Sequence, residues 1–383
     1  MSNLRNLLSE QLQENPSLYL KISEISNHTK EELNDFIYDK TIFLDFGKLL
    51  DIINVISPEN SAEIIKQYIE TIDVNHPTAQ QVLEYVFINR FDYCYSFLNR
   101  MLEAMNEENR YFATVYKLHY KNLSQWFQYD LNEIASSPTL HAFKTIIELY
   151  SLYTHDHIPT ALRKKDYVEY TINNFVQDEF IRKYYLVHYY RVLMIILLNQ
   201  DEISECRRMA NEILRLKDRV GYNFLKNAYH VLGMSYLFED YDKGIHYLYK
   251  TRELYKIHPF SYDGDLHSSI NLHQILWGEE PEDLRFNSEK NLDIHDIVHY
   301  YIMKNDYAKA RQTLLKVNED EIKERDNAFH FLYKGILEDN TDHFYKSIML
   351  FKQIGDKLHC QLPINELKKR GLNPLLIDTL LIN

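Results

Sequence analysis

Glycine and proline are scarce in this chain, which has only nine of each among its 383 residues. Average proteins use roughly 7% glycine and 5% proline, so tight turns are few here. A protein built from many short strands needs such turn residues wherever the chain reverses. The scarcity therefore argues against a strand-rich fold and predicts an all-α protein whose helices are joined by short loops.

Cysteine and long apolar runs are also scarce. The three cysteines, Cys94, Cys206 and Cys360, are widely spaced and odd in number, which suits a reducing cytoplasm better than a disulfide framework. No stretch of about 18 uncharged apolar residues exists, so we expect no segment that spans a membrane. The first residues do not resemble a secretory signal either. We therefore expect a cytoplasmic protein with no membrane partner.

Positive charge is in deficit, because 43 lysines and arginines stand against 56 aspartates and glutamates, for a net charge of −13. A chain this acidic attracts nucleic acid poorly over its bulk, so any contact with DNA must come from a local surface. The length exceeds that of one ordinary core. We expect either two or more domains or an elongated array of repeats.

A helix-turn-helix unit recurs in the second half of the chain. It is seen in AYHVLGMSYLFEDYDKGIHYLYKTREL (228–254), IVHYYIMKNDYAKARQTLLKV (297–317) and AFHFLYKGILEDNTDHFYKSIMLFKQ (328–353). Gly233, Gly244 and Gly335 provide small contact points between paired helices. Along the sequence, the turns of the first two units are separated by about twice the 34-residue tetratricopeptide period. This predicts a tetratricopeptide-like right-handed superhelix with a concave inner surface. An unrelated helical bundle is the alternative.

The first 45 residues follow a different pattern. Asn15 is placed to cap a helix that starts at Pro16 and ends near Ser26. Thr29 and Glu32 then form a capping box that opens a second helix, and Leu33 and Phe36 face its core side. This spacing predicts an amino-terminal helix-turn-helix of the kind that binds DNA.

Motifs of catalysis are missing. The sequence has no glycine-rich phosphate loop, no nucleophile elbow and no paired CxxC. His295 and His299 lie one helical turn apart, a spacing that can bind zinc, but no third ligand is evident and a chain with 17 histidines has such pairs by chance. We expect neither a metal nor another cofactor, and we expect that the protein is not an enzyme.

Several stretches of the chain together resemble one known family. They are SECRR, WGEEPEDLRFNSEKNLDIHD, AFHFLYKGILEDNTDHFYKSIMLFKQ and GDKLHCQLPINELKKRGLNPLL, in this order. The family is that of the arbitrium receptors, the AimR regulators by which temperate phages read a short peptide and choose between lysis and lysogeny. The resemblance implies a helix-turn-helix DNA-binding domain over 1–45 and a peptide-binding superhelix over 46–360. It also implies carboxy-terminal capping and dimerisation helices over 361–383.

The resemblance also implies peptide-binding residues. Asp296 and Asp356 fall where family members grip an arginine of the peptide, and His295 lies beside the first, where the family carries a glutamine. Asn199 matches an asparagine that contacts the peptide backbone. The expected ligand is therefore an arginine-containing peptide of about six residues, bound by charge-assisted hydrogen bonds. The alternative is that both aspartates are solvated charges at helix ends.

Other expected peptide-binding positions depart from the family pattern. Asn223 stands where the family has an arginine, and Met234 and Ile195 stand where it has asparagines. The resemblance thus implies that the peptide keeps its arginine but differs elsewhere.

The DNA-binding side chains are expected on the outward face of the amino-terminal module. They are Lys21, Thr29, Lys30, Asn34, Tyr38 and Lys40. Lysines would bind phosphates, and an asparagine can bind adenine in a bidentate manner. Only four basic residues stand against eight acidic ones in 1–45, so one module should bind weakly and a homodimer on two half-sites of operator DNA would compensate. A Rap-type receptor that binds response regulators instead of DNA is the alternative.

The chain ends on an apolar stripe. We expect a helix to start at Pro363 and a last one after Asn373-Pro374, with Leu376, Ile377, Leu380 and Leu381 on one face. This stripe either caps the last repeat or forms the dimer interface.

Overall fold

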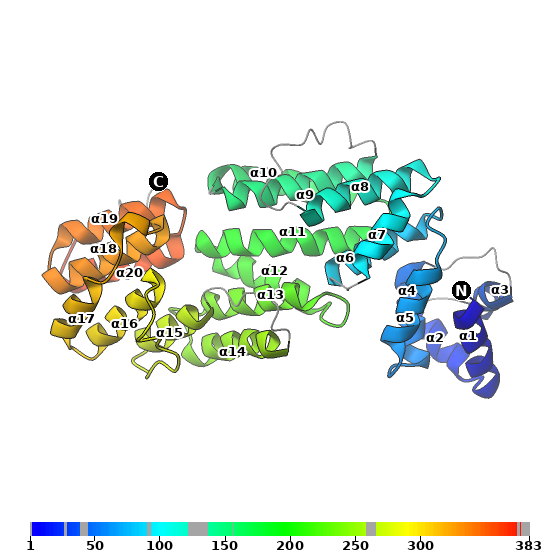
Figure 1. Cartoon of the computed structure of the whole chain (residues 1–383), viewed down its shortest axis with the longest axis horizontal. Helices are drawn as coiled ribbons and strands as arrows, with labels where there is room; N and C mark the ends of the chain where they lie inside the picture. The colour runs from blue at the N-terminus through cyan, green and yellow to red at the C-terminus, as the bar shows by residue number, and fades with distance from the viewer. Residues whose placement is uncertain are drawn as a thin grey trace. The chain divides into compact units, whose positions relative to one another are not determined.

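The computed structural model describes residues 2–26, 29–38, 45–89, 93–121, 137–155, 157–257, 266–373 and 376. Within these ranges every long regular element is an α-helix and no strand occurs, which confirms the all-α prediction (Figure 1). In the same ranges, no helix combines the length and apolar character needed to cross a membrane. The chain forms two compact units, Met1–Ser151 with Tyr167–Leu186, and Leu152–Asp166 with Val187–Asn383. They are described separately below as the amino-terminal and carboxy-terminal units.

The helices of the amino-terminal unit are α1 (Ser2–Glu14), α2 (Leu18–Ser26), α3 (Lys30–Tyr38), α4 (Phe46–Ile56), α5 (Ser61–Thr71), α6 (Thr78–Asn89), α7 (Cys94–Leu102) and α8 (Glu107–Lys121). Three further helices contribute residues to both units: α9 (Pro138–Thr154), α10 (Ile158–Phe175) and α11 (Glu179–Asn199). The helices of the carboxy-terminal unit are α12 (Ile203–Leu214), α13 (Tyr222–Ser235), α14 (Tyr241–Ile257), α15 (Leu266–Leu276), α16 (Asn291–Met303), α17 (Tyr307–Leu314), α18 (Glu324–Glu338), α19 (Thr341–Gln353) and α20 (Lys357–Lys369).

The start of the chain folds locally as its capping residues predict. The Asn15 side chain accepts hydrogen bonds from the backbone N–H and hydroxyl of Ser17, and α2 then begins at Leu18, two residues after the predicted start. The Thr29 N–H donates to the Glu32 carboxylate over 2.8 Å, and the Glu32 N–H donates back to the Thr29 hydroxyl over 3.2 Å. This reciprocal pair is the predicted capping box.

Helices α2 and α3 follow one another in the chain, and the capping box stands at the start of α3. Leu33 and Phe36 are buried, as predicted, and the guanidinium of Arg5 on α1 lies 4.9 Å from the centre of the Phe36 ring. Residues 27 and 28 of the predicted turn lie outside the described ranges.

Gln81 joins two helix starts inside the amino-terminal unit. Its amide donates to Asp45, which caps α4, over 2.8 Å and to Asp178, which precedes α11, over 2.6 Å. Its carbonyl oxygen accepts the backbone N–H of Phe46 over 2.7 Å. A buried glutamine with both its donors used and its acceptor engaged fixes these two helix starts against each other.

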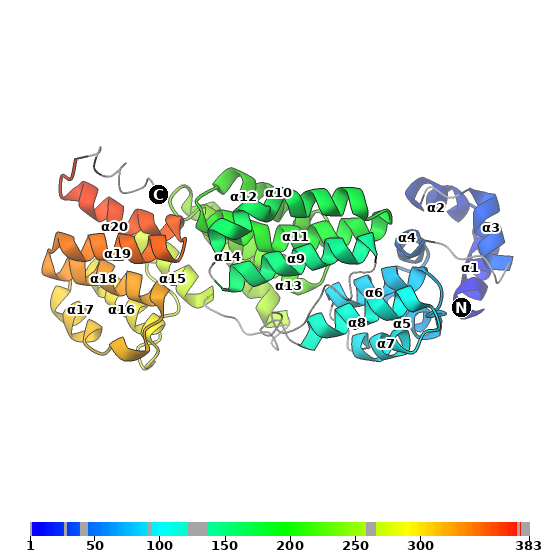
Figure 2. The same ribbon diagram turned by 90° about the horizontal axis from the view of Figure 1, so that it is seen from above.

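The carboxy-terminal unit consists of antiparallel helix pairs in succession, the tetratricopeptide-like arrangement that the repeats predict. Helix α13 packs on α14, α16 on α17 and α18 on α19, as both views show (Figures 1 and 2). A Cβ added to Gly233 would lie 2.6 Å from Leu248, and one added to Gly335 would lie 2.7 Å from the Phe344 ring. Glycine thus sets the close approach within two of the pairs.

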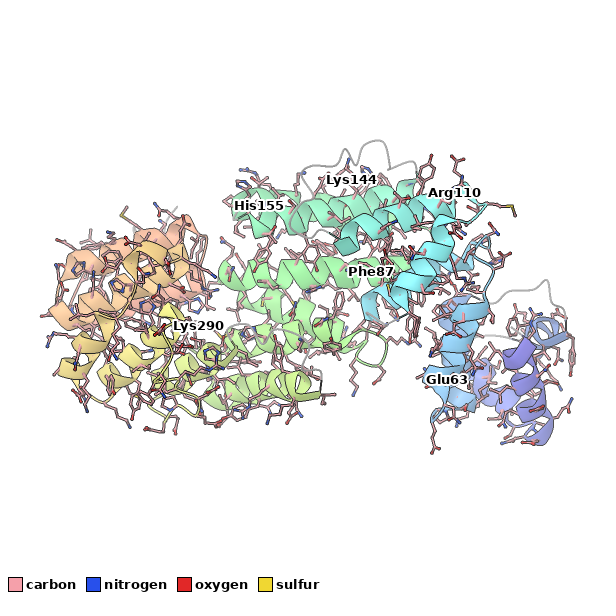
Figure 3. All side chains as sticks on the ribbon, in the orientation of Figure 1. Glu63, Phe87, Arg110, Lys144, His155 and Lys290 are labelled. Carbon is pink, nitrogen blue, oxygen red and sulfur yellow. The ribbon has the colours of Figure 1, made fainter. Side chains whose placement is uncertain are left out.

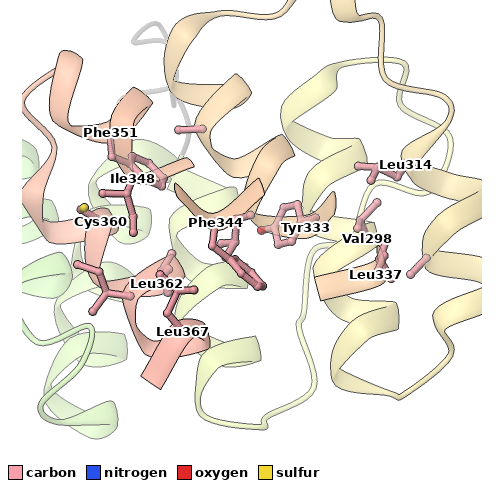
Figure 4. Packing of buried hydrophobic residues seen from close by; sticks show 14 of the residues in the cluster. Val298, Leu314, Tyr333, Leu337, Phe344, Ile348, Phe351, Cys360, Leu362 and Leu367 are labelled. Atoms are coloured by element: carbon pink, nitrogen blue, oxygen red, sulfur yellow. The ribbon is translucent and has the colours of Figure 1, made fainter. Parts of the chain in front are cut away.

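A continuous apolar core holds the last pairs together. Val298 of α16, Leu337 of α18, Phe344 of α19 and Leu367 of α20 are all buried in one cluster (Figure 4). Because each helix contributes one apolar face, no pair buries its hydrophobic surface alone and the pairs stabilise one another.

The helix predicted to start at Pro363 begins earlier. Helix α20 starts at Lys357, and the Asp356 carboxylate caps it by accepting the backbone N–H of His359 over 3.1 Å. Pro363 lies inside this helix, so the prediction of its start was wrong. The aspartate cap decides the start because its carboxylate satisfies a backbone donor of the first turn, which a proline side chain cannot do. Residue 360, the expected boundary of the last segment, lies inside the same helix.

Candidate functional site

A pocket with a volume of about 300 Å³ opens in the carboxy-terminal unit. Its walls come from α11, α13, α15, α16 and α18, with single residues from α9, α14 and α20. Four of the predicted peptide-binding residues line it, although they come from three helices far apart in the sequence: Asn199, Met234, His295 and Asp296. Ile195, one turn before Asn199 on α11, lines it as well.

The other two predicted residues do not line the pocket. Asn223 is half-buried in the first turn of α13, one turn before Asn227, where that helix first reaches the pocket. Asp356 is buried behind His359, which does line it. The structure therefore brings together four of the six side chains and places the fifth directly beneath the surface.

Asp296 is a buried acid at the pocket wall. It lies on α16, which starts after Lys290 (Figure 3). Its carboxylate accepts the Ser268 hydroxyl over 2.6 Å and the Asn271 amide over 3.0 Å. Burial raises the pKa of Asp296 to about 6, although these two hydrogen bonds oppose the rise. A carboxylate that loses solvent in this way gains more from an incoming cation than an exposed one does.

A second aspartate extends the network behind Asp296. The His267 imidazole donates to Asp293 Oδ1 over 2.6 Å, and the Ser288 hydroxyl donates to Asp293 Oδ2. The polar atoms of His267, Asp293 and Asp296 lie within 4.8 Å of one another, which is a spacing that suits a metal ion. All four carboxylate oxygens already accept a hydrogen bond, however, so the two carboxylates are satisfied without an ion.

His295 is joined to a second buried histidine. Its Nε2 lies 3.3 Å from Nδ1 of His330, and Nε2 of His330 lies 3.2 Å from the Glu319 carboxylate. A bond from Lys334 lowers the pKa of Glu319, so this carboxylate stays an acceptor. It favours the His330 proton at Nε2, which leaves Nδ1 to accept the N–H of His295.

Burial lowers the pKa of His295 to about 3, with the neighbouring His330 adding to the effect. Burial also lowers the pKa of His299 to about 4, and its ring packs 5.4 Å from that of Tyr333. The zinc group that the spacing of the two histidines allowed is not formed among the described residues.

Asp356 already has two nitrogen-bearing partners within the chain. Its carboxylate lies 2.9 Å from Nδ1 of His359 and 3.3 Å from Nη2 of Arg325. Burial alone would raise the pKa of Asp356, but His359 and Arg325 outweigh it and hold that pKa well below its usual range. Nδ1 of His359 also lies 3.2 Å from Arg325 Nη2, but a nitrogen that donates to the carboxylate cannot accept there as well. Asp356 is thus an ionised acid with an internal arginine partner.

Arg325 was not predicted from the sequence as a pocket residue. Arg325, Phe329 and Tyr333 all line the pocket, and their spacing of four residues puts them on one face of α18. That spacing was visible in the sequence, but it did not reveal which face of α18 points to the pocket.

The predicted DNA-binding residues lie on the amino-terminal module, and most are exposed. Lys21, Thr29 and Lys30 are exposed, and Tyr38 keeps 69% of its surface in solvent. Two of them also have internal roles: Thr29 forms the capping box, and the Lys30 ammonium lies 4.9 Å from the centre of the Tyr19 ring.

Asn34 and Lys40 differ from these. Asn34 is half-buried and accepts the Tyr19 hydroxyl over 2.8 Å, so a bidentate contact with adenine would replace that bond. Lys40 lies outside the described ranges. So do Ile377, Leu380 and Leu381 of the carboxy-terminal stripe, whereas Leu376 is described and 55% exposed.

Comparison with known proteins gives the family. A sequence model described as AimR transcriptional regulator-like matches residues 61–369, which is most of the chain. The chain belongs to this family. The AimR family consists of transcriptional regulators, so the expectation that the protein is not an enzyme is confirmed.

Individual AimR proteins are similar over long alignments. The AimR transcriptional regulator of Bacillus phage SPbeta is 25% identical over 393 residues, covering all of both chains. That of Bacillus phage phi3T is 23% identical over 346 residues, covering 88% of this chain and 89% of the other.

Two solved AimR structures share the fold. A structure of selenomethionine phAimR is 20% identical, with a TM-score of 0.72 over 99% of this chain and all of the other. A structure of phAimR-Ligand is 22% identical, with a TM-score of 0.66 over 86% of this chain and 98% of the other. The tetratricopeptide-like fold expected for the chain is thereby confirmed.

Proposed function

We propose that this AimR-family protein is a peptide-responsive DNA-binding regulator that acts as a homodimer in the cytoplasm of a bacterial host. Its ligand is a short peptide carrying an arginine, and its output is the choice of a phage between lysis and lysogeny. The observation that carries the proposal is the gathering of Asn199, Met234, His295 and Asp296 around one pocket. The similar structure of phAimR-Ligand is consistent with a ligand-binding family.

Asp296 is the residue that holds the peptide's arginine in this proposal. It lies at the pocket wall, and its oxygens are oriented by Ser268 and Asn271. A carboxylate fixed in this way loses little entropy when it binds a guanidinium, and the pair is strengthened by the low polarity of the site. Asn199, at the end of α11, is placed to bind a peptide amide.

Regulation of DNA binding follows from the dimer. Lys21 and Lys30 of the module in residues 1–45 contact phosphates, and two modules together bind two half-sites of the operator. The peptide changes operator affinity only if it binds one form of the dimer more tightly than the other. We propose that the preferred form has its modules at a separation that no longer fits the half-sites.

A screen of matched peptides tests the proposal. Synthetic peptides translated from the short open reading frames beside the gene are measured by calorimetry, each in an arginine and a citrulline version. Citrulline keeps the shape of arginine but lacks its charge, so the proposal predicts at least about tenfold weaker binding of the citrulline peptide. Asp296→Asn should remove that difference. If no peptide binds, or if both versions bind equally, the proposal is wrong.

A further inference from the structure

Arg325 gives the pocket its one fixed positive charge among the described residues. No lysine and no other arginine lines the pocket, whereas two aspartates, Asp296 and Asp326, do. The histidine nearest to Asp296 on the pocket wall, His295, is neutral, because burial lowers its pKa to about 3. Arg325 is therefore the one lysine or arginine side chain of this pocket that can pair with an anionic group of a ligand.

The guanidinium of Arg325 is held on one side and open on the other. Nη2 lies 3.3 Å from the buried Asp356 carboxylate and 3.2 Å from His359. Within the described part of the chain, Nε and Nη1 make no hydrogen bond, and about half of the side chain is exposed. Planar guanidinium groups present paired N–H donors to a carboxylate, and here one pair is still available.

The contact with Asp356 restricts the Arg325 side chain but leaves N–H donors of its guanidinium available to a ligand. An arginine anchored by a buried acid loses less conformational entropy on binding than a free surface arginine does. The resemblance assigned Asp356 to the arginine of the peptide, but Arg325 of the chain itself lies on that acid. The aspartates that line the pocket are Asp296 and Asp326, of which the proposed function assigns Asp296 to the peptide's arginine, and the group that Arg325 can receive is an anion.

We propose that Arg325 is a carboxylate-binding subsite of the peptide pocket. The pocket is then bipolar, with Asp296 for the ligand's guanidinium and Arg325 for a ligand carboxylate. This inference rests on the proposed peptide-binding function and adds the chemistry of the second end of the ligand. The carboxylate is either the free carboxyl terminus of the peptide or an acidic side chain, and the test separates the two.

The test uses two mass-labelled pools of synthetic hexapeptides that contain one arginine and are randomised elsewhere. One pool has free carboxyl termini and the other has terminal amides. Full-length protein captures peptides from the mixed pools, and mass spectrometry gives the ratio of acid to amide. A terminal-carboxylate subsite predicts that the wild type enriches the acid pool about tenfold or more, the gain expected of one charge-assisted bond. A side-chain subsite predicts equal pools but a similar enrichment of Asp or Glu at one position.

Three variants decide the role of Arg325. Arg325→Gln should bring either enrichment to within about twofold of unity, whereas Lys323→Gln, which removes an exposed charge from outside the pocket, should leave it at the wild-type value. Arg325→Lys keeps the charge beside Asp356 but not the planar fork, so it should retain the fold and show an intermediate ratio.

Other outcomes overturn the inference. If Arg325→Gln weakens capture of acid and amide peptides by the same factor, Arg325 only braces Asp356. If the wild type captures peptides without preference for any carboxylate, the subsite does not exist, although the proposed function stands. If the wild type captures no peptide, the proposed function fails together with the subsite.

Discussion

Nε2 of His295 lies 3.3 Å from Nδ1 of His330, so two buried imidazoles connect the pocket wall to Glu319 in the short 3-10 helix Glu319–Glu321. Burial makes a positive charge on either ring unfavourable. Burial lowers the pKa of both, that of His295 to about 3. The pair is thus neutral and hydrogen-bonded, and its protonation at low pH should destabilise the folded protein.

Replacing His295 should make the protein less sensitive to acid. The pKa of His295 is lower in the folded chain than its unfolded value of about 6.5, so its contribution to stability is complete above about pH 6.5 and is lost as pH falls toward 3. His295→Gln removes this loss, which amounts to about 2 kcal/mol between pH 7 and pH 5. Urea unfolding at both pH values measures it. An equal loss in wild type and variant would show that His295 does not stay neutral.

Peptide affinity should also depend on pH, through Asp296. Burial raises the pKa of Asp296 to about 6, so this acid is ionised above that pH and protonated below it. A guanidinium prefers the ionised form. Affinity for an arginine peptide should therefore be constant above about pH 7 and fall by roughly tenfold between pH 7 and pH 5. Calorimetry across this range tests it, with Asp296→Asn as the control that should show a flat profile.

Removing Asp356 should destabilise the carboxy-terminal unit. Asp356→Ala leaves His359 and Arg325 without their buried acid and deletes the cap of α20. Asp356 is buried but Arg325 is about half exposed, so the loss should be smaller than for a fully buried ion pair and amount to about 2–3 kcal/mol, cap included. The matched control is Asp306→Ala, which deletes a similar cap, on α17, whose ion pair is exposed. Thermal unfolding should show a much larger loss for Asp356→Ala, and equal losses would contradict the ion-pair argument.

Adding one methyl group at Gly335 should loosen the pairing of α18 and α19. A Cβ there would lie 2.7 Å from the Phe344 ring, and overpacking of this kind costs about 1–3 kcal/mol. The double change Gly335→Ala with Phe344→Leu makes room for the methyl and should recover part of the loss. Chemical unfolding of both variants measures this, and the close-packing argument fails if Gly335→Ala is as stable as wild type.

Local features of the fold were predictable from the sequence because they depend on neighbouring residues. The capping box of Thr29 and Glu32 and the close contact at Gly335 are examples. The pocket was predicted in part, since only a resemblance to a family placed Asn199 and Asp296 together. The pairing of Arg325 with Asp356 was not predicted, because it joins two helices whose relative rotation no short pattern encodes.

The start of α20 was also missed. Proline at a first helical position is a common pattern, and it drew attention to Pro363. Asp356 competes as a cap seven residues earlier, and its carboxylate caps the first turn of α20. One local signal, the aspartate cap, thus outweighed another, the proline, at this position.

The central claim is that a peptide controls DNA binding by this protein. The most direct measurement is a mobility-shift titration of the purified protein on the DNA that flanks its own gene, with and without saturating peptide from the screen. The account predicts a specific complex that Lys21→Ala and Lys30→Ala together weaken, and whose affinity falls when peptide is added. Unchanged affinity at saturating peptide, or no specific complex in either condition, would contradict it.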